Sequence, residues 1–428
     1  MKEHEEPYNI VVVGAGASGL IAASRAAEKG VSVLLLEKKD RAGRKLLITG
    51  KGRCNITNTA SQTAYYKHIH PQPRFLKHAF SRFFNRDVVE LLEQHGVETT
   101  EERGGRVYPS SNQSKDILEA LLQMTQKNGV TIWPGCRVNK IITGNQTVTG
   151  VEIISSDHSQ VIDCQKVILC TGGKSYPATG SEGDGYDLAA SQGHSIVPVR
   201  PALVPLVTRE KIEERMVDLV LKNVRVTLWV NGKKRAAQFG EMFFTSFGLS
   251  GPVILTLSRI AVDEVKQGHI VNLSIDLKPA LDEKKLDNRL LRDLNDHGKK
   301  KIISLFKMWL PADIIPLFLE HTGIDPSREA SHITAKERRR IKMLMKSLTY
   351  HIKGPRSFQE AIITAGGIPT HEILSKTMES RLVRNLYFAG ELIDLDGDTG
   401  GYNLQIAWST GWLAGEEAAT SLIQRTTR

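Results

Sequence analysis

The sequence of 428 residues has few cysteines and no long apolar run. Its four cysteines, Cys54, Cys136, Cys164 and Cys170, form no CxxC pair and show no metal-ligand spacing. We therefore expect reduced thiols, no bound metal and no dithiol redox centre. No run approaches the ~20 apolar residues that span a bilayer, so the sequence predicts no transmembrane helix.

The N-terminus lacks the features of a targeting segment. "MKEHEEPYNI" is polar and runs directly into an apolar strand, which leaves no room for a signal peptide. We therefore expect a cytoplasmic protein that does not bind membranes. With 40% hydrophobic and 24% charged residues the composition is typical of a globular protein, and the length predicts two or three domains.

Acidic residues are outnumbered in one part of the chain. The net charge is +10, and residues 281–356 contain 17 Lys or Arg against 10 Asp or Glu. The densest basic runs lie at 299–301 and at 336–346, "KERRRIKMLMK". Such a segment could bind polyphosphate nonspecifically, although a single basic helix is as often a solvated face.

One stretch near the N-terminus predicts a dinucleotide site, "YNIVVVGAGASGLIAASRAAEKGVSVLLLEK". An apolar strand leads into G-x-G-x-x-G at Gly14, Gly16 and Gly19, and a helix and a second apolar strand ending in Glu37 follow. The first glycine permits the tight turn, the second lets backbone approach a pyrophosphate, and the third lets the helix pack on the strand. The helix N-terminus favours phosphate, and Glu37 is placed to accept the ribose hydroxyls.

The sequence has no second G-x-G-x-x-G with its own helix and acidic strand end, so a bound flavin fits better than a nicotinamide dehydrogenase. Two later segments also favour a long cofactor. "KVILCTGGKSYPATGSEGDGYDLAAS" predicts a buried strand, then Thr171, Gly172 and Gly173, then a helix near Asp184. "LYFAGELIDLDGDTGGYNLQIAWSTGWLAGEEAA" predicts a strand, an acid-rich loop and two glycines that open a long helix. The backbone of both turns can line a second part of the cofactor.

Several long motifs resemble one known family. "GRKLLITGKGRCNITN", "GGKSYPATGSEGDGY", "FTSFGLSGP", "ITAGGI" and "YFAGELIDLDGDTGGYNLQIAWSTG" make the chain similar along its length to the BaiN/RdsA-type (YhiN-like) NAD(P)/FAD-dependent oxidoreductases. The resemblance implies an α/β fold: a Rossmann-like FAD-binding domain of the glutathione-reductase type, interrupted by a β-rich, barrel-like domain and a small helical domain. We place these domains at 1–195 with 355–428, at 196–278 and at 279–354.

The resemblance also implies how the segments hold FAD. Arg44 and Lys45 would neutralise phosphate, and Arg53 and Asn55 could hydrogen-bond ribityl or ring atoms. The helix N-terminus at "DTGGYNLQ" would stabilise reduced flavin near N1 and C2=O, although Asp398 could equally cap that helix. The residues expected at the cofactor are Gly14, Gly16, Ala17, Ser18, Gly19, Glu37, Lys38, Arg44, Lys45, Gly50, Gly52, Arg53, Cys54, Asn55, Val138, Thr171, Gly172, Gly173, Asp184, Gly390, Glu391, Asp398, Gly400, Gly401, Tyr402 and Asn403.

Three side chains are candidates for the chemistry. Arg106 and Tyr108 precede a turn and an amphipathic helix, and there they could position a carbonyl or donate a proton. Arg106 could equally form a structural salt bridge. A Cys54 thiolate beside a flavin could form an adduct or relay electrons, with its pKa lowered by neighbouring bases. Because no resolving cysteine lies at redox spacing, we favour a small buried thiol that packs against the ring.

Together these features predict an FAD-dependent oxidoreductase that NAD(P)H reduces, with the substrate meeting the flavin at a cleft between domains. The resemblance implies either reduction of a uridine in ribosomal RNA or oxidation of a small amine, and the basic segment favours the uridine, with the base drawn out of its stack. A small-amine oxidase that uses oxygen and a non-enzymatic RNA-binding flavoprotein are the alternatives. Against RNA, the basic region has no obvious aromatic platform for stacking.

Overall fold

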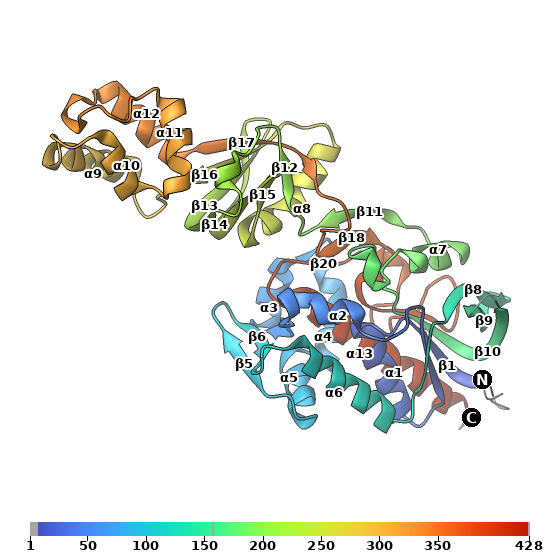
Figure 1. The fold of residues 1–428 in the computed structure, drawn as a ribbon. Coiled ribbons are helices and arrows are strands. Elements are labelled where there is room, and N and C mark those ends of the chain that lie inside the picture. Colours follow the sequence, from blue (N-terminus) through green and yellow to red (C-terminus); the bar gives the residue numbers. More distant parts are fainter. Residues whose placement is uncertain (1–6, 156–157, 427–428) are drawn as a thin grey trace. The chain divides into compact units, whose positions relative to one another are not determined.

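The computed structural model describes residues 7–155 and 158–426. Most of the polar N-terminal stretch that argues against a signal peptide lies outside these residues. The chain forms two compact units, Met1–Pro201 with Ala361–Arg428, and Ala202–Glu360. The predicted fold class is confirmed, because the structure contains a Rossmann-type α/β unit, a closed barrel and a group of helices (Figure 1). The finer boundary between barrel and helices stays a prediction, because both belong to the second unit.

A seven-stranded sheet forms the core of the first unit. Its strands are β1 Tyr8–Val13, β2 Val33–Glu37, β7 Thr131–Pro134, β8 Arg137–Gly144, β9 Thr147–Ser155, β10 His158–Leu169 and β19 Leu386–Phe388. The order is β7-β2-β1-β10-β9-β8, and β19 pairs with β10. Strand β1 lies in parallel between β2 and β10. A central parallel strand is buried on both faces, which explains why its sequence is continuously apolar.

Helices and three small sheets complete this unit. The helices are α1 Ala17–Glu28, α2 Arg44–Ile48, α3 Gln62–Tyr65, α4 Lys77–Arg82, α5 Asn85–Gln94, α6 Ser114–Lys127, α7 Asp184–Ser191 and α13 Tyr402–Thr426. The small sheets are built from β3 Thr57–Asn58, β4 Ile69–His70, β5 Thr99–Glu102, β6 Arg106–Pro109, β11 Val197–Ala202, β18 Ile363–Gly367 and β20 Asp396–Gly397. They pair as β3-β6-β5, β4-β20 and β11-β18, so the small sheets join segments far apart in the sequence.

The first and last helices of the unit cross at very short range. A Cβ atom on Gly411 of α13 would lie 2.4 Å from the Ser18 carbonyl oxygen, and one on Gly415 would lie 2.2 Å from that of Ala22. Both contacts are with the backbone of α1, which cannot rotate out of the way as a side chain can. The glycines of α13 therefore set how closely it holds the helix that follows the G-x-G-x-x-G turn.

The second unit is a six-stranded closed barrel with helices inserted before its last strand. The barrel strands are β12 Leu206–Thr208, β13 Val220–Val230, β14 Lys233–Thr245, β15 Gly248–Ser250, β16 Val271–Asp276 and β17 Leu348–Pro355, in the order β12-β15-β14-β13-β16-β17. The helices are α8 Pro252–Lys266, α9 Glu283–Asp296, α10 Ile302–Trp309, α11 Ile315–Thr322 and α12 Ala335–Lys346. Among the helices of the described residues, none combines the length and the hydropathy of a transmembrane span.

Replacing Gly415 by Val tests the close helix crossing. The added side chain collides with backbone, so we expect the free energy of unfolding to fall by about 1–3 kcal/mol, the usual scale of overpacking. Urea unfolding measures the change. Gly144→Ala is the matched control, since its nearest neighbour, the Thr149 methyl group, is 3.7 Å from the added Cβ atom. Equal stability of the two variants would contradict the tight crossing.

Candidate functional site

The predicted dinucleotide turn lies between β1 and α1, and its glycines have different surroundings. Gly14 has φ +99°, and a Cβ atom there would lie 2.7 Å from the Cys170 carbonyl oxygen. A Cβ atom on Gly19 would lie 1.8 Å from the Gly14 carbonyl oxygen. A Cβ atom on Gly16 meets no atom within 4 Å. The chain itself therefore requires the first and third glycines, whereas the space beside Gly16 is open for a pyrophosphate.

Glu37 ends β2 beside this turn. Its carboxylate accepts hydrogen bonds from the backbone N–H groups of Ala15 (3.0 Å) and Lys39 (2.9 Å). Each oxygen keeps a second lone pair, so the carboxylate can also accept from ribose hydroxyls. The N–H of Cys136 donates to the Glu37 carbonyl at 2.9 Å, which brings the start of β8, with the buried Val138, to the same strand end.

Two residues expected at the cofactor pair with each other instead. Lys38 donates to Asp184 at 2.8 Å and to Glu182 at 3.0 Å. Arg137 lies 3.4 Å from Asp184. Asp184, the first residue of α7, therefore forms ion pairs with both Lys38 and Arg137. These ion pairs link β2, β8 and α7.

The turn after β10 contains an unusual buried group. The Thr171 hydroxyl is buried and has no hydrogen-bond partner among the residues that the structure describes. A Cβ atom on Gly173 would lie 2.4 Å from the Thr364 hydroxyl and 2.8 Å from Glu391 Oε1. Gly172 has φ +72°, a left-handed conformation that glycine adopts without strain. An orphaned hydroxyl beside the dinucleotide turn fits a site that receives a polar ligand.

Glu391 joins three segments at this turn. Its carboxylate accepts from Lys45 Nζ at 2.6 Å, from Ser175 Oγ at 2.8 Å and from the Thr364 N–H at 2.7 Å. The charge of Lys45, expected on phosphate, is therefore compensated within the protein. Arg44 pairs with Asp40 at 2.9 Å. Both bases at the start of α2 therefore have an acidic partner.

Cys54 lies in a loop of left-handed residues. Gly50 and Gly52 have φ +58° and +85°, and the non-glycine residues Lys51 and Cys54 have φ +59° and +58°. Such a conformation is uncommon for side-chain-bearing residues and persists where the surroundings enforce it. Burial raises the pKa of the Cys54 thiol to about 12, and a hydrogen bond with Thr49 offsets only part of that rise. The thiol is therefore neutral near pH 7, which disfavours thiolate chemistry.

Arg53 packs on the ring of the buried Tyr108. The Arg53 guanidinium pairs with Glu102, donates to Asn112 at 2.7 Å, and lies 4.1 Å from the centroid of the Tyr108 ring. These contacts hold Arg53 against β5 and β6. With its amide oriented to satisfy its neighbours, Asn55 instead accepts from the Gly401 N–H at 3.0 Å.

The glycines of the C-terminal motif, Gly390 and Gly401, lie very close to earlier segments of the chain. A Cβ atom on Gly401 would lie 2.3 Å from the Thr57 carbonyl oxygen, and one on Gly390 would lie 2.6 Å from Ser18 Oγ. Asn403 closes the turn, because its side chain accepts from the Gly397 N–H at 2.8 Å and donates to the Gly397 carbonyl at 2.7 Å. The motifs that are far apart in the sequence thus lie together around the G-x-G-x-x-G turn.

At the turn from Gly397 to Gly401 the structure assembles a cluster that sequence reasoning missed in part. His68 Nδ1 lies 2.8 Å from Asp398 Oδ2, and the His68 ring stacks on Tyr402 with centroids 4.6 Å apart. His70 Nε2 is 4.0 Å from the other Asp398 oxygen. The only local signal was the H-x-H spacing, which puts both imidazoles on one side of an extended segment. Asp398 therefore contacts a histidine and not only its helix.

Arg106 borders this cluster. It is half-buried, and no hydrogen bond or ion pair of its guanidinium is found among the described residues. A Cβ atom on Gly400 would lie 3.8 Å from Arg106 Nε. Burial raises the pKa of Tyr402, Asp398 raises it further and Arg106 opposes the rise. The four side chains, Arg106, His68, Asp398 and Tyr402, form what we call the Arg106–His68 cluster.

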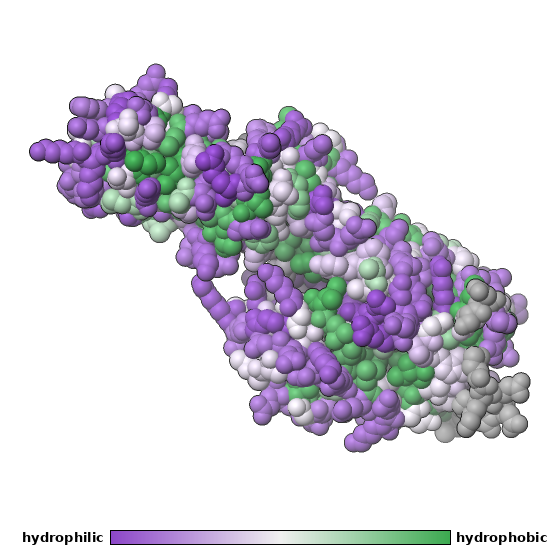
Figure 2. All heavy atoms as spheres, in the orientation of Figure 1, coloured by the Kyte–Doolittle hydropathy of each residue, from purple (hydrophilic) through white to green (hydrophobic). Residues whose placement is uncertain are grey.

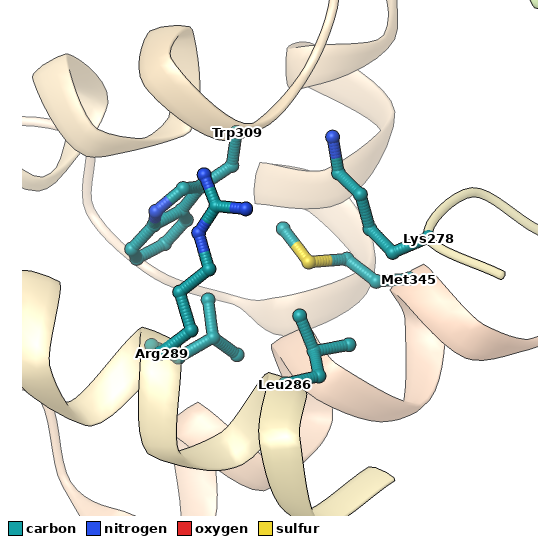
Figure 3. A pocket seen from close by; sticks show the side chains of 6 residues that line it. Lys278, Leu286, Arg289, Trp309 and Met345 are labelled. Atoms are coloured by element: carbon teal, nitrogen blue, oxygen red, sulfur yellow. The ribbon is translucent and has the colours of Figure 1, made fainter. Parts of the chain in front are cut away.

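A small hollow lies in the second unit, and no metal site is found among the described residues. No group of three or more His, Cys, Asp or Glu side chains suited to a metal occurs within the described residues. A hollow in the second unit is lined by Lys278, Leu286, Arg289, Trp309 and Met345 (Figure 3). Its empty volume of about 220 Å³ includes space open to solvent, so the enclosed hollow is far smaller than the ~300–1,000 Å³ typical of small-molecule sites.

The buried Cys54 thiol predicts a pH effect on stability. The unfolded chain loses the thiol proton near the ordinary pKa of about 8.5, whereas the folded protein keeps it up to about pH 12. Between these values the thiolate favours the unfolded state, so the free energy of unfolding falls by up to about 1.4 kcal/mol per pH unit. Cys54→Ala removes this contribution, so between pH 8.5 and 11 the wild type should lose more stability in urea titrations than the variant. Parallel curves would contradict a neutral buried thiol.

Comparisons with known proteins agree with this architecture. A family model described as "HI0933-like protein Rossmann domain" matches residues 8–417. The chain is 33% identical to the 3-dehydro-bile acid delta(4,6)-reductase of Clostridium scindens, over 96% of this chain and 98% of that protein. It is 29% identical to the ribosomal RNA dihydrouridine synthase of Escherichia coli, again over 96% and 98%.

A solved structure shares the fold. The 3-ketosteroid delta1-dehydrogenase from Sterolibacterium denitrificans superposes with a TM-score of 0.52 at 13% identity, over 97% of this chain and 99% of that one. The family match spans most of the chain and one relative exceeds 30% identity over nearly its whole length. The chain therefore belongs to the HI0933-like Rossmann-domain family and is an FAD-dependent oxidoreductase.

Proposed function

We propose that this protein reduces a carbon–carbon double bond conjugated to a carbonyl group, with uridine in ribosomal RNA as the candidate substrate. The observation that carries the proposal is the Arg106–His68 cluster beside Gly400 and Gly401. The names of the two relatives support it. A 3-oxo steroid with a 4,6-diene and the uracil ring of uridine both contain an alkene conjugated to a carbonyl, so one type of site suits both reactions.

The first unit would hold FAD through the residues that sequence reasoning singled out. The open backbone at Gly16 would face the pyrophosphate and Glu37 the ribose. Thr171, whose hydroxyl has no partner, would gain one in the cofactor. When bound, FAD supplies the hydride. We further propose NAD(P)H as a transient donor, since the chain has a single G-x-G-x-x-G.

On the substrate side, Arg106 would anchor the carbonyl oxygen. A guanidinium without a protein partner can donate two hydrogen bonds to an oxygen that gains negative charge during the reaction. Hydride addition to one alkene carbon requires a proton at the other carbon. Because Nδ1 of His68 faces Asp398, Nε2 is the nitrogen that can deliver this proton. Asp398 would orient the ring and stabilise its protonated form.

The basic helical segment supports RNA less strongly than its charge count suggests. Arg338 lies 3.3 Å and Lys342 lies 3.8 Å from Asp287, and Lys346 lies 2.5 Å from Asp276. The large aromatic side chains of this region are also buried, with Trp309 at 4% exposure. Charges that are compensated within the fold contribute little to phosphate binding. The small-amine oxidase is the competing function, and it needs no RNA contact.

Gly16→Val tests the cofactor site. Because a Cβ atom at this position meets nothing within 4 Å and the backbone is extended at φ −86°, we expect the variant to fold with wild-type stability. The isopropyl group would occupy the space for the pyrophosphate, so the purified protein should be colourless. FAD content per chain, measured by absorbance after denaturation, gives the result. Stoichiometric FAD in a folded Gly16→Val protein would contradict the site.

His68→Gln tests the reaction. Anaerobically reduced enzyme is mixed with ribosomal RNA fragments, and dihydrouridine is measured by mass spectrometry. Loss of a general acid should slow reoxidation about 10²- to 10⁴-fold, while FAD content and reduction by NAD(P)H stay unchanged. His371→Gln, at a side chain that is 79% exposed, is the control. Turnover of amines with oxygen, and none of RNA, would instead establish the competing function.

A further inference from the structure

The outer face of the barrel strands β13 and β14 carries an exposed aromatic ring beside several bases. Phe239 is 53% exposed, and it is the only aromatic among the strongly exposed large apolar side chains of the described residues. Arg225 lies directly opposite it on β13. In the orientation of Figure 1, hydrophobic spheres reach the surface next to hydrophilic ones in the region of these strands (Figure 2).

The register shows which side chains share this face. Arg225 pairs with Phe239, Thr227 with Ala237 and Trp229 with Lys234. The intervening residues of β13, Val224, Val226 and Leu228, are buried in the barrel. Directly paired residues project to the same side of a sheet, so the outward face presents two aromatic rings, two bases and small residues between them. Small residues leave the face flat enough for a planar ring to approach.

Most bases of this face have no acidic partner within the described residues. Residues 220–241 contain five Lys or Arg and one acid, Glu241. No ion pair is found within the described residues for Lys222, Arg225, Lys233 or Lys234. Arg235 alone has a partner, Glu264 at 3.5 Å. Asp276, which lies opposite Arg225 on β16, is already paired with a lysine of α12. The face therefore presents a local excess of positive charge.

A polar group next to Trp229 also lacks a partner. Asn272 lies directly opposite Trp229 on β16, and its side-chain oxygen is buried without a hydrogen bond. The indole N–H donates to Ser274 at 2.9 Å, so it does not satisfy the amide. A buried acceptor without a partner costs free energy unless a ligand supplies a donor. The N–H groups on a nucleobase edge are donors of this kind.

We propose that the outer face of β13 and β14 binds single-stranded RNA, with a base stacked on Phe239 and phosphates held by Arg225 and Lys234. Aromatic rings interleaved with bases are the usual means of binding single-stranded nucleic acid, because every base has a face that can stack. The surface lies in the barrel and not in the basic helices, where the aromatic rings are buried. The inference rests on the proposed function, since it names the residues that would hold the RNA substrate.

The test measures binding of FAD-loaded protein to a short single-stranded RNA by fluorescence anisotropy. Phe239→Ala should weaken binding about 5- to 150-fold, the range found for losing one base stack, and Phe239→Trp should restore it. Arg225→Gln should reduce the slope of log K against log salt by about 0.7, as expected for one phosphate contact on a single strand. Met308→Ala, at a side chain that is 52% exposed on α10, should bind as the wild type does.

The outcomes separate this surface from the proposed function. If wild-type protein binds and reduces RNA but Phe239→Ala binds equally well, the surface is wrong and the proposed substrate stands. If wild-type protein binds no RNA and turns over only amines, both are wrong. The wild type could instead bind anionic phospholipid vesicles and no RNA, with the vesicle binding lost in Phe239→Ala. That result would identify a membrane-facing patch and overturn the proposal. Thermal unfolding confirms that each variant is folded.

Discussion

The carboxylate of Glu391 connects the segments on which the candidate site depends. It accepts hydrogen bonds from Lys45, Ser175 and the backbone N–H of Thr364, all at 2.6–2.8 Å. The acceptor and its donors come from four separate stretches of the chain. Hydrogen bonds to a charged acceptor are about twice as strong as neutral ones. The interaction therefore holds the flanks of the dinucleotide turn in one arrangement before any cofactor binds.

Close backbone approach is the second constraint on the site. The chain leaves no room for side chains at Gly14, Gly19 and Gly401, because backbone atoms lie within 3 Å of where a Cβ atom would be. Gly16 is different, since its surroundings are empty. A glycine motif read from sequence does not distinguish these two reasons. The structure does, because of these four glycines only Gly16 leaves room for a side chain, and we propose that this room is for the cofactor.

Whether a basic side chain can bind a polyanion depends on the ion pairs that it already forms. The basic run of α12 attracted attention by its density, yet Arg338, Lys342 and Lys346 each lie within 4 Å of an aspartate. The hairpin of β13 and β14 has fewer bases in sequence, but Arg225 and Lys234 lack such partners within the described part of the chain. The density of bases in the sequence therefore does not by itself say which charges are available to a polyanion.

The sequence by itself determined the β1–α1–β2 unit and hence the FAD-binding fold. Its signals are local: a buried apolar strand, a glycine turn, a helix and an acidic strand end follow one another within 30 residues or so. Such patterns depend on neighbours in the chain, so propensity and spacing are enough to find them. The motifs that resemble the BaiN/RdsA-type family also implied a barrel-like domain, and the closed barrel confirms this.

Only the tertiary structure decided which distant side chains meet. His68 and Asp398 are 330 residues apart, and β4 and β20 must pair before the imidazole reaches the carboxylate. The outward direction of Phe239 likewise depends on the register of β14 in the closed barrel, because a shift of one residue would turn the ring into the core. Contacts of this kind arise from the packing of whole segments, and no local pattern of residues encodes them.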